Sequence, residues 1–242
     1  MSKFTLVLVV ILLGASLAGN LNAAAIQIYS TGACAGANTG ASGCSGGLLP
    51  LGANDNNWQY VVRPDAGTTG LNSSLVVSPI GGSPGWVGTD TVSEWLSPVP
   101  GGNFAAPTSW TAQDTFSLAG FIPSTLTLNL SVAADNLIAV VVDGTTVFTP
   151  ACNNGPPSLQ PYCFQQFYNT TVNNAQVTGG FLPGTNTIQL LLSNTDNPSP
   201  TGFRVEISGN ATAITPEPAT WKLMMLTLLV AGLAAVPLAR RK

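Results

Sequence analysis

The 242-residue sequence contains no histidine, and only 7% of its residues are charged. Without an imidazole the chain cannot build a Ser-His-Asp triad, and it lacks the commonest protein ligand of zinc. The segment 26–214 carries nine acidic residues against two basic ones, Arg63 and Arg204. This excess of negative charge repels phosphate backbones, so the composition excludes nucleic acid as a partner.

The nine acidic residues are scattered singly, and most lie in turn sequences such as 143–144 and 196–198. Aspartates in turns usually serve as acceptors for backbone hydrogen bonds. A glycoside hydrolase needs two carboxyl groups that flank the scissile bond, and no spacing in the chain indicates such a pair. We therefore expect a protein that is not an enzyme and has no catalytic residue.

The N-terminal residues 1–25 have the organisation of a secretory signal peptide. Lys3 precedes the apolar run 4–13, and small residues follow it. This order of positive charge, apolar core and small residues predicts cleavage after Ala23 or Ala25. A buried N-terminal strand is the alternative, but strands of soluble proteins rarely contain so long an apolar run.

Residues 221–239 are predicted to form a transmembrane helix near the C-terminus. A helix of this length measures about 28 Å, close to the thickness of the hydrocarbon layer of a bilayer. Arg240, Arg241 and Lys242 follow it. The positive-inside rule places these charges in the cytoplasm and the segment 26–214 outside. A buried core helix is the alternative.

Directly before this helix stand Pro216, Glu217 and Pro218. The two prolines keep the segment extended, so a protease can bind it as a strand-like peptide. Pro-Glu-Pro, a short apolar helix and an arginine-rich end, in this order, resemble the PEP-CTERM sorting tail of Gram-negative bacteria. The resemblance assigns residues 215–242 to such a tail. A GPI-anchor signal is the rival, but such signals do not normally end in three basic residues.

The resemblance implies an exosortase-type protease and the inner membrane as partners of the chain. It implies that the ectodomain is anchored outside the cytoplasm, and that the mature protein then moves to the cell surface or is secreted. Proteins with such tails often occur in cells that produce exopolysaccharide.

Between the two ends, residues 26–214 show many strand signals and almost no helix signals. Polar and apolar residues alternate over 125–132 and 202–208, as in strands with one buried face. In the second run, Phe203, Val205 and Ile207 are predicted to point inward, and Arg204 and Glu206 outward.

A hairpin is predicted where Asp143 and Gly144 separate the β-prone runs 136–142 and 145–148. Another strand is predicted over 187–192. Short strands joined by turns over about 190 residues favour an all-β sandwich or barrel.

The order of short motifs over 58–208 resembles a galactose-binding-like jelly roll that recurs in PEP-CTERM proteins. This resemblance implies a jelly-roll-like β-sandwich ectodomain that binds sugars or glycoconjugates at its loops, with a structural calcium ion in many relatives. The motifs that carry it are 55–58, 93–98, 114–118, 134–136, 142–144, 183–186 and 202–206.

The four cysteines are an even number, which in an exported chain predicts two disulfides. Their spacing pairs Cys34 with Cys44 and Cys152 with Cys163. A metal site is the alternative, but neither pair has Cys-x-x-Cys spacing and no histidine is available to complete one.

Two tryptophans are candidates for stacking against a sugar ring, Trp86 and Trp110. Trp58 and Trp95 lie within the family-like motifs and are expected in the core. The residues that offer oxygen atoms to a calcium ion are Asp55, Asp135 and Asn136, although turn formation explains them equally well.

These features predict an exported, non-enzymatic protein with a structural or binding role in the cell envelope or extracellular matrix, and with polysaccharide as a possible partner. No cofactor is required, although a structural calcium ion is compatible with the sequence. The alternatives are a carbohydrate-binding module with a calcium-supported loop and, less favoured, a glycoside hydrolase.

Replacing Pro216 and Pro218 with alanine is expected to block processing of the tail without affecting the fold, because the extended protease-binding segment is lost. Replacing Arg240 and Arg241 with alanine is expected to weaken membrane orientation and retention. Mass spectrometry of the mature C-terminus in an exosortase-bearing host checks the first expectation. A mature chain that still ends at the same residue after the proline changes contradicts it.

Overall fold

The computed structural model describes residues 22–62, 74–78, 85–98, 103–104, 108–154, 161–195 and 199–214. The predicted helix 221–239 and the sorting residues Pro216, Glu217, Pro218, Arg240 and Arg241 lie outside these ranges, as does nearly all of the predicted signal peptide. Within the described ranges, no helix has the length and apolar character needed to cross a membrane. The compact unit Ala23–Thr212 is called the body below.

The described part of the chain is all-β, as predicted, with no α-helix and two short 3₁₀ helices, η1 (Gly36–Asn38) and η3 (Asn174–Gln176). The strands are β1 (Ala23–Ala25), β2 (Asn54–Val62), β3 (Ser74–Val77), β4 (Leu96–Ser97), β5 (Asn103–Phe104), β6 (Thr108–Ser117), β7 (Phe121–Asp135), β8 (Leu137–Val142), β9 (Thr145–Phe148), β10 (Asn153–Asn154), β11 (Pro161–Tyr162), β12 (Tyr168–Asn173), β13 (Thr185–Asn194), β14 (Ser199–Pro200) and β15 (Gly202–Ala213).

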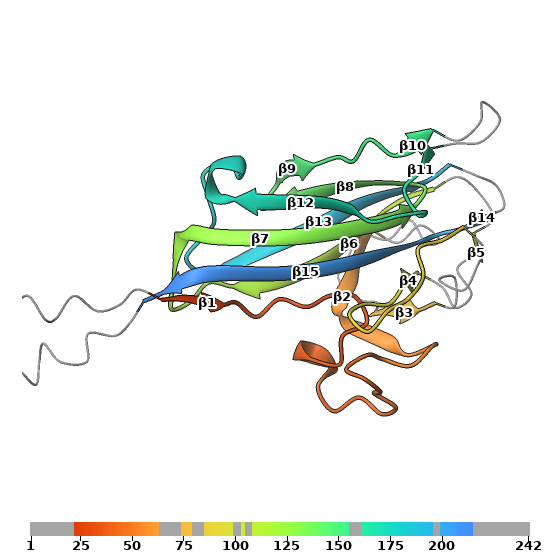
Figure 1. The fold of residues 1–242 in the computed structure, drawn as a ribbon, viewed down its shortest axis with the longest axis horizontal. Helices are drawn as coiled ribbons and strands as arrows, with labels where there is room; N and C mark the ends of the chain where they lie inside the picture. The colour runs from red at the N-terminus through yellow and green to blue at the C-terminus, as the bar shows by residue number, and fades with distance from the viewer. Residues whose placement is uncertain are drawn as a thin grey trace, which may run out of the picture. The chain divides into compact units, whose positions relative to one another are not determined.

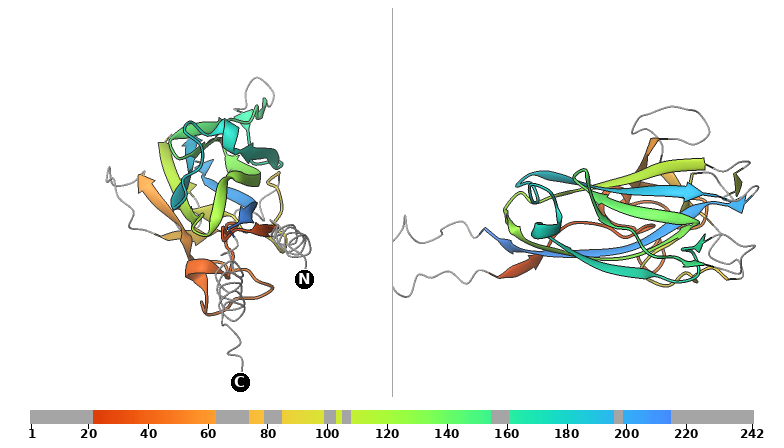
Figure 2. Two further views of the ribbon diagram at one scale, coloured as in Figure 1. Left: turned by 90° about the vertical axis from the view of Figure 1, so that its left-hand side faces the viewer. Right: turned by 90° about the horizontal axis from the view of Figure 1, so that it is seen from above.

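One antiparallel sheet contains most of these strands, in the order β12-β7-β15-β4-β3-β2-β6-β13-β8-β9, and β1 pairs with β15. The sheet curls so that β12, β7 and β15 form one layer, and β6, β13 and β8 form the other (Figures 1 and 2). The first and last residues of the body, Ala23 and Thr212, are cross-strand partners. Both chain connections therefore leave the body at the same end.

The inner faces of the two layers share one hydrophobic core. In β15, Phe203, Val205 and Ile207 are buried, which confirms the predicted inward face. The Phe203 ring lies 5.5 Å from the ring of Trp58 on β2 and 5.7 Å from that of Trp110 on β6, in edge-to-face geometry. These aromatic contacts join the two layers across the core.

The predicted hairpin is confirmed between β8 and β9. Asp143 and Gly144 have φ values of 45° and 79°, so both central residues are left-handed. A two-residue type I′ turn requires this backbone geometry, and Asp-Gly is one of the sequences that adopt it.

Both predicted disulfides form, Cys34 with Cys44 and Cys152 with Cys163. The carboxylate of Asp55, itself fully buried, anchors the first disulfide loop to β2. Its Oδ2 accepts the Gly32 N–H at 2.7 Å, and its Oδ1 accepts the Asn38 side-chain amide at 2.8 Å. The Asn57 N–H also donates to Oδ1 at 2.8 Å.

The body also buries a second carboxyl group, Asp114 on the inner face of β6, which is 5% exposed. Burial, with a smaller contribution from the nearby Asp55 charge, raises the pKa of Asp114 to about 7, although the Thr115 and Tyr29 backbone N–H groups oppose this. A carboxyl group whose pKa is higher in the folded than in the unfolded chain binds its proton more tightly when folded. Stability therefore falls as the pH rises from about 4 to about 7.

We expect the melting temperature to be lower at pH 8 than at pH 5, and Asp114→Asn to reduce this difference, because the amide cannot ionise. The shift from 3.8 to about 7 corresponds to at most about 4 kcal/mol, of which at most about 3 kcal/mol falls between pH 5 and pH 8. Thermal unfolding of both proteins across this pH range measures the difference. An unchanged pH dependence in the variant contradicts the assignment.

Candidate functional site

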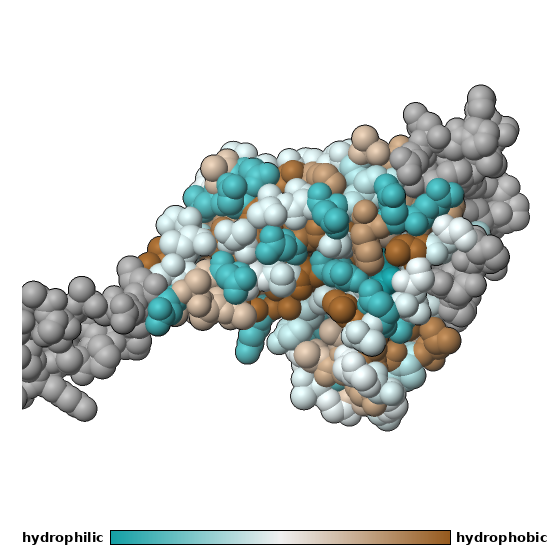
Figure 3. Space-filling model, viewed as in Figure 1, coloured by the Kyte–Doolittle hydropathy of each residue, from teal (hydrophilic) through white to brown (hydrophobic). Residues whose placement is uncertain are grey.

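A hollow of about 500 Å³ lies over the outer face of β12, β7 and β15. Hydrophilic side chains cover much of this face (Figure 3). We call the hollow the sheet groove. Its lining residues are Ser30, Val92, Asn129, Leu130, Ser131, Asn169, Thr170, Thr171, Glu206, Ile207 and Ser208.

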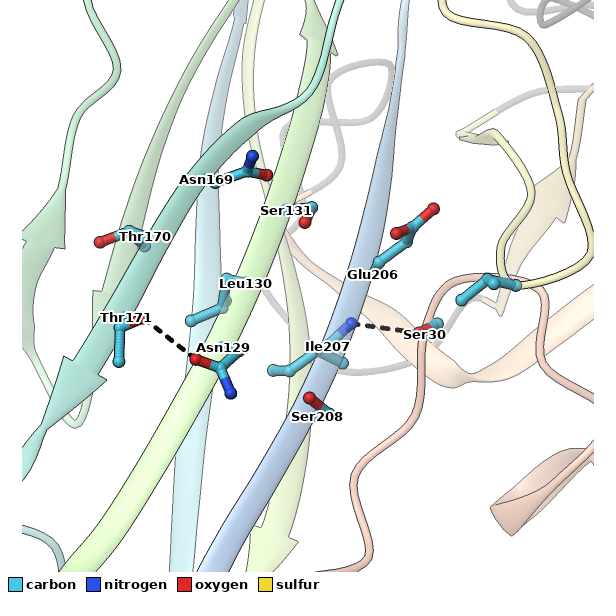
Figure 4. A pocket seen from close by; sticks show the side chains of 11 residues that line it. Ser30, Asn129, Leu130, Ser131, Asn169, Thr170, Thr171, Glu206, Ile207 and Ser208 are labelled. Atoms are coloured by element: carbon cyan, nitrogen blue, oxygen red, sulfur yellow. Dashed lines mark hydrogen bonds between the residues drawn. The ribbon is translucent and has the colours of Figure 1, made fainter.

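The floor of the sheet groove is an array of uncharged hydrogen-bonding groups. Asn169 of β12 pairs with Ser131 of β7, and Thr171 pairs with Asn129. The Thr171 hydroxyl donates to the Asn129 side-chain oxygen at 3.0 Å (Figure 4). Within the described residues, the side chains of Asn169 and Ser131 have no hydrogen-bond partner, so their donors and acceptors are available to a ligand.

The groove runs across the strands. Three neighbouring strands each contribute about three consecutive residues, and Ser30 and Val92 close the far side of β15 (Figure 4). Strands lie about 4.8 Å apart, so four neighbouring elements span about 14 Å, whereas three residues along a strand span about 7 Å. At the far side, Val92 is 49% exposed and offers an apolar contact surface.

Glu206 is the only charged residue in the lining of the sheet groove. One of its carboxylate oxygens, Oε1, lies 3.5 Å from Nη2 of Arg204 and accepts a hydrogen bond from the Ser93 hydroxyl at 3.3 Å. Burial, with the hydrogen bond to Asp90 and the negative charge of Asp90, raises the pKa of Glu206. These contacts hold the Glu206 side chain in place. Of the two neighbouring carboxyl groups, Glu206 and Asp90, Glu206 binds a proton more tightly.

Arg204 organises this end of the groove from below. Its Nη2 lies 2.7 Å from Oδ2 of Asp90, its Nε donates to the Ser93 hydroxyl at 2.7 Å, and its Nη1 donates to the Gly88 carbonyl. Burial opposes ionisation of Asp90, but the Val92 N–H, the hydrogen bond from Glu206 and the Arg204 charge together lower its pKa. Asp90 is thus the ionised partner of the guanidinium.

The prediction that Arg204 points outward needs correction. Strand alternation does direct it away from the core face, but its side chain is 0% exposed. The segment 85–94 covers this part of β15 and supplies the acceptors, and the Phe167 ring packs at 4.8 Å from the guanidinium carbon. Glu206, two residues later, does reach the surface, at the groove.

The two candidate tryptophans differ in their surroundings. Trp110 is 2% exposed, and its indole N–H donates to the Thr201 hydroxyl at 3.3 Å. Its predicted ligand role is therefore wrong, because a sugar cannot reach a buried ring. Trp86 is half-buried and stacks on Phe164 with 5.0 Å between ring centres, so one ring face is covered, and a ligand role for it stays a prediction. Trp58 and Trp95 are fully buried, as predicted.

The calcium candidates are not gathered into one site. Asp55 uses both carboxylate oxygens within the first disulfide loop, whereas the Asn136 side-chain oxygen accepts the N–H and the hydroxyl of Thr195. Asp135 is 3% exposed. Among the residues that the structure describes, no three acidic or cysteine side chains converge in a way that would hold a metal.

The sequence did not single out the groove residues, although one signal was present. Asn129, Ser131, Asn169 and Thr171 occupy alternate, outward positions of two strands and are all small polar residues. Their pairing brings them together, and pairing between segments 40 residues apart cannot be read from either strand alone.

No family model and no curated protein matches the chain. Among solved structures, it is similar to a Stig cyclase from Fischerella sp. TAU (13% identity, 80% of this chain and 100% of that one, TM-score 0.40). It is also similar to a family 35 carbohydrate binding module from an environmental isolate (13% identity, 69% of this chain and 98% of that one, TM-score 0.28). A third similar structure is an alpha-xylosidase from Xanthomonas citri (12% identity, 44% of this chain and 12% of that one, TM-score 0.25). The chain thus spans about an eighth of the xylosidase. At these TM-scores the similarities carry no argument about function.

Arg204→Ala is expected to lower the free energy of unfolding by about 3 kcal/mol, because the buried hydrogen-bond network under the groove loses its central donor. Arg204→Lys keeps the charge without the planar fork and should lie between wild type and alanine. Urea unfolding monitored by tryptophan fluorescence measures both. A loss within about 0.5 kcal/mol for alanine would show that Arg204 is not structural.

Proposed function

We propose that the protein is an exported, non-enzymatic β-sandwich of jelly-roll-like architecture that binds a neutral polysaccharide in the sheet groove. The observation that carries the proposal is the array of uncharged amide and hydroxyl groups over three neighbouring strands, with free hydrogen-bonding capacity at Asn169 and Ser131. In this proposal the PEP-CTERM-like tail holds the body on the outer side of the inner membrane until an exosortase releases it to the surface or medium.

The chemistry of the groove suits a hydroxyl-rich and uncharged ligand. Amide and hydroxyl groups both donate and accept, as sugar hydroxyls do, and they need no counter-charge. The one carboxyl in the lining, Glu206, lies 3.5 Å from the guanidinium of the buried Arg204, which offsets part of its negative charge. An anionic polymer would find no free cation among the lining residues.

The shape of the groove suits a chain. The hollow is longer across the strands than along them, and its residues come from an outer sheet face and not from a closed cavity (Figure 4). A polymer segment can therefore lie across β12, β7 and β15 without its ends being enclosed. Val92 at the far side provides contact for the apolar face of a sugar ring.

Two features of the body support export and tethering. Its two disulfides favour an oxidising compartment. Its first and last strands pair with one another, so a tether attached to Thr212 leaves at the end where the chain enters (Figure 1).

A hydrolytic role is less favoured by the carboxyl geometry. Glu206 and Asp90 form a hydrogen bond with one another, and Arg204 and Ser93 occupy their remaining contacts. A retaining glycosidase needs its carboxyl groups about 5–5.5 Å apart, and an inverting one about 6.5–9.5 Å, with the sugar between them. Two carboxyl groups that are hydrogen-bonded to one another leave no space for a sugar between them.

We expect affinity electrophoresis in gels that contain glucan, galactan, mannan or xylan to show retardation by at least one polymer. The double variant Asn129→Ala/Asn169→Ala removes two hydrogen-bonding groups worth about 1 kcal/mol each, so the dissociation constant should rise about 10- to 30-fold. Asn210→Ala, an exposed asparagine on β15 outside the groove, is the matched control and should bind as wild type does.

Each measurement is made with and without EDTA. Loss of retardation on chelation favours the calcium-supported binding module over the present proposal. No retardation of the wild type by any of the four polymers favours a purely structural role. Equal retardation of the double variant and the wild type places the binding site elsewhere.

A further inference from the structure

Successive side chains of the extended segment 25–30 lie in different environments. It runs beside β15: the Ile26 N–H donates to the Gly209 carbonyl at 3.0 Å, and the Ser30 hydroxyl accepts the Ile207 N–H at 3.1 Å. Ile26 and Ile28 are buried in the core, and Ser30 lines the sheet groove. Ala25, Gln27 and Tyr29, which alternate with Ile26 and Ile28, point away from the core, as expected for extended backbone.

These alternate residues line two further hollows. Ala25, Gln27 and Tyr29 form one wall of a hollow of about 610 Å³, whose other wall includes Thr115 and Ser117 of β6. A neighbouring hollow of about 280 Å³ shares Tyr29 and Thr115. We call the two together the Tyr29 groove. The polar side chains in the lining of the smaller hollow include Asn56, Asn57, Gln59 and Gln113.

Tyr29 is held in place before any ligand arrives. Its backbone carbonyl accepts the Trp58 indole N–H at 3.1 Å. Gly36 of η1 lies so close that a Cβ there would collide with the Tyr29 ring and the Asn57 side-chain oxygen. Asn57 in turn accepts the Ala37 N–H at 2.8 Å, within the loop closed by the first disulfide. The ring position is thus fixed by the folded loop, which lowers the entropy cost of stacking a ligand on it.

The Tyr29 groove combines an aromatic ring with amide and hydroxyl groups. This is the residue set that recognises a sugar, since the ring packs against the apolar face and the polar groups bind the hydroxyls. The acidic residue in its lining, Asp114, is 5% exposed, and its Oδ1 accepts the Thr115 N–H at 2.6 Å. Like the sheet groove with Glu206, the Tyr29 groove thus has one carboxyl group in a lining that is otherwise uncharged.

The two grooves lie on different sides of the segment 25–30, since Ser30 lines the sheet groove and its neighbour Tyr29 lines the other. The inner face of β15 meets the inner faces of β2 and β6 through the contacts of Phe203 with Trp58 and Trp110. The sheet groove lies on the outer side of β15, and the Tyr29 groove lies against the outer residues Gln113, Thr115 and Ser117 of β6.

We infer that the Tyr29 groove is a second binding site for a neutral polysaccharide, and that the protein bridges two polymer chains, one in each groove. This inference rests on the proposed function of the sheet groove. It adds cross-linking of a matrix to simple attachment, since a body with two separate sites can hold two chains together.

The test uses the neutral polymer, among glucan, galactan, mannan and xylan, that retards the wild type most. Light scattering of that polymer is followed as protein is added. A bridging protein should raise scattering to a maximum and then lower it, because excess protein occupies every chain singly. Tyr29→Ala and Thr115→Arg should reduce the maximum by about tenfold or more while retardation in gels falls less than about threefold.

One further variant, together with Thr115→Arg, makes the result specific. Tyr29→Phe keeps the ring and should scatter as wild type does. Thr115→Arg fills the groove from an exposed position on β6, outside the first disulfide loop, so it separates loss of the site from loss of the loop fold. Thermal unfolding confirms that each variant is folded.

Three outcomes overturn the inference, and they are distinguishable. If the wild type binds no polymer, the proposed function fails with it. If Tyr29→Ala abolishes all retardation and the Asn129→Ala/Asn169→Ala variant has no effect, the sheet groove is not a site and no bridge exists. The asparagine variant could weaken binding while Tyr29→Ala and Thr115→Arg give the same scattering as the wild type. In that case the sheet groove is a binding site and only the second site is contradicted.

Discussion

The contact of Phe203 with Trp58 and Trp110 is the interaction on which the rest of the body depends. These three rings come from β15, β2 and β6, and they meet edge to face at the centre of the core. Because they bind the two layers at their inner faces, the outer faces of both layers turn to solvent. Large aromatic side chains bury more apolar surface than any other residue type, which suits a body with few charges and no α-helix in its described part.

A surface with so few charges has to remain hydrated by other means. Asparagine, serine, threonine and glutamine occupy the outward strand positions, and the cross-strand pairs of Asn169 with Ser131 and Thr171 with Asn129 bring them into regular arrays. The groups in such arrays bind water through hydrogen bonds, so the surface stays hydrated without charged side chains. The same property that keeps the sheet hydrated makes it complementary to sugar hydroxyls, and we propose that the protein uses it in this way.

Local patterns predicted much of the fold, because they depend on neighbouring residues. The alternation over 202–208, the turn at Asp143 and the two short cysteine loops each contain their own physical cause. The site depends instead on long-range pairing. From the sequence, Arg204 is expected at the surface, but the segment 85–94 covers it. Trp110 is a candidate for stacking against a sugar, but Phe203 packs against it in the core. The two environments of the residues in 25–30 depend on pairing with β15, which lies near the other end of the sequence, so they cannot be predicted from the segment itself.

Hydrogen–deuterium exchange of the body, with and without a bound neutral oligosaccharide, tests the central claim most directly. The account predicts that the ligand slows exchange in 129–131, 169–171 and 206–208, and in 25–30 on the side of Tyr29, because these backbones form the floors and walls of the two grooves. Protection confined to other segments, such as the residues around Trp86 and Phe164, or no protection with a ligand that is bound, would contradict it.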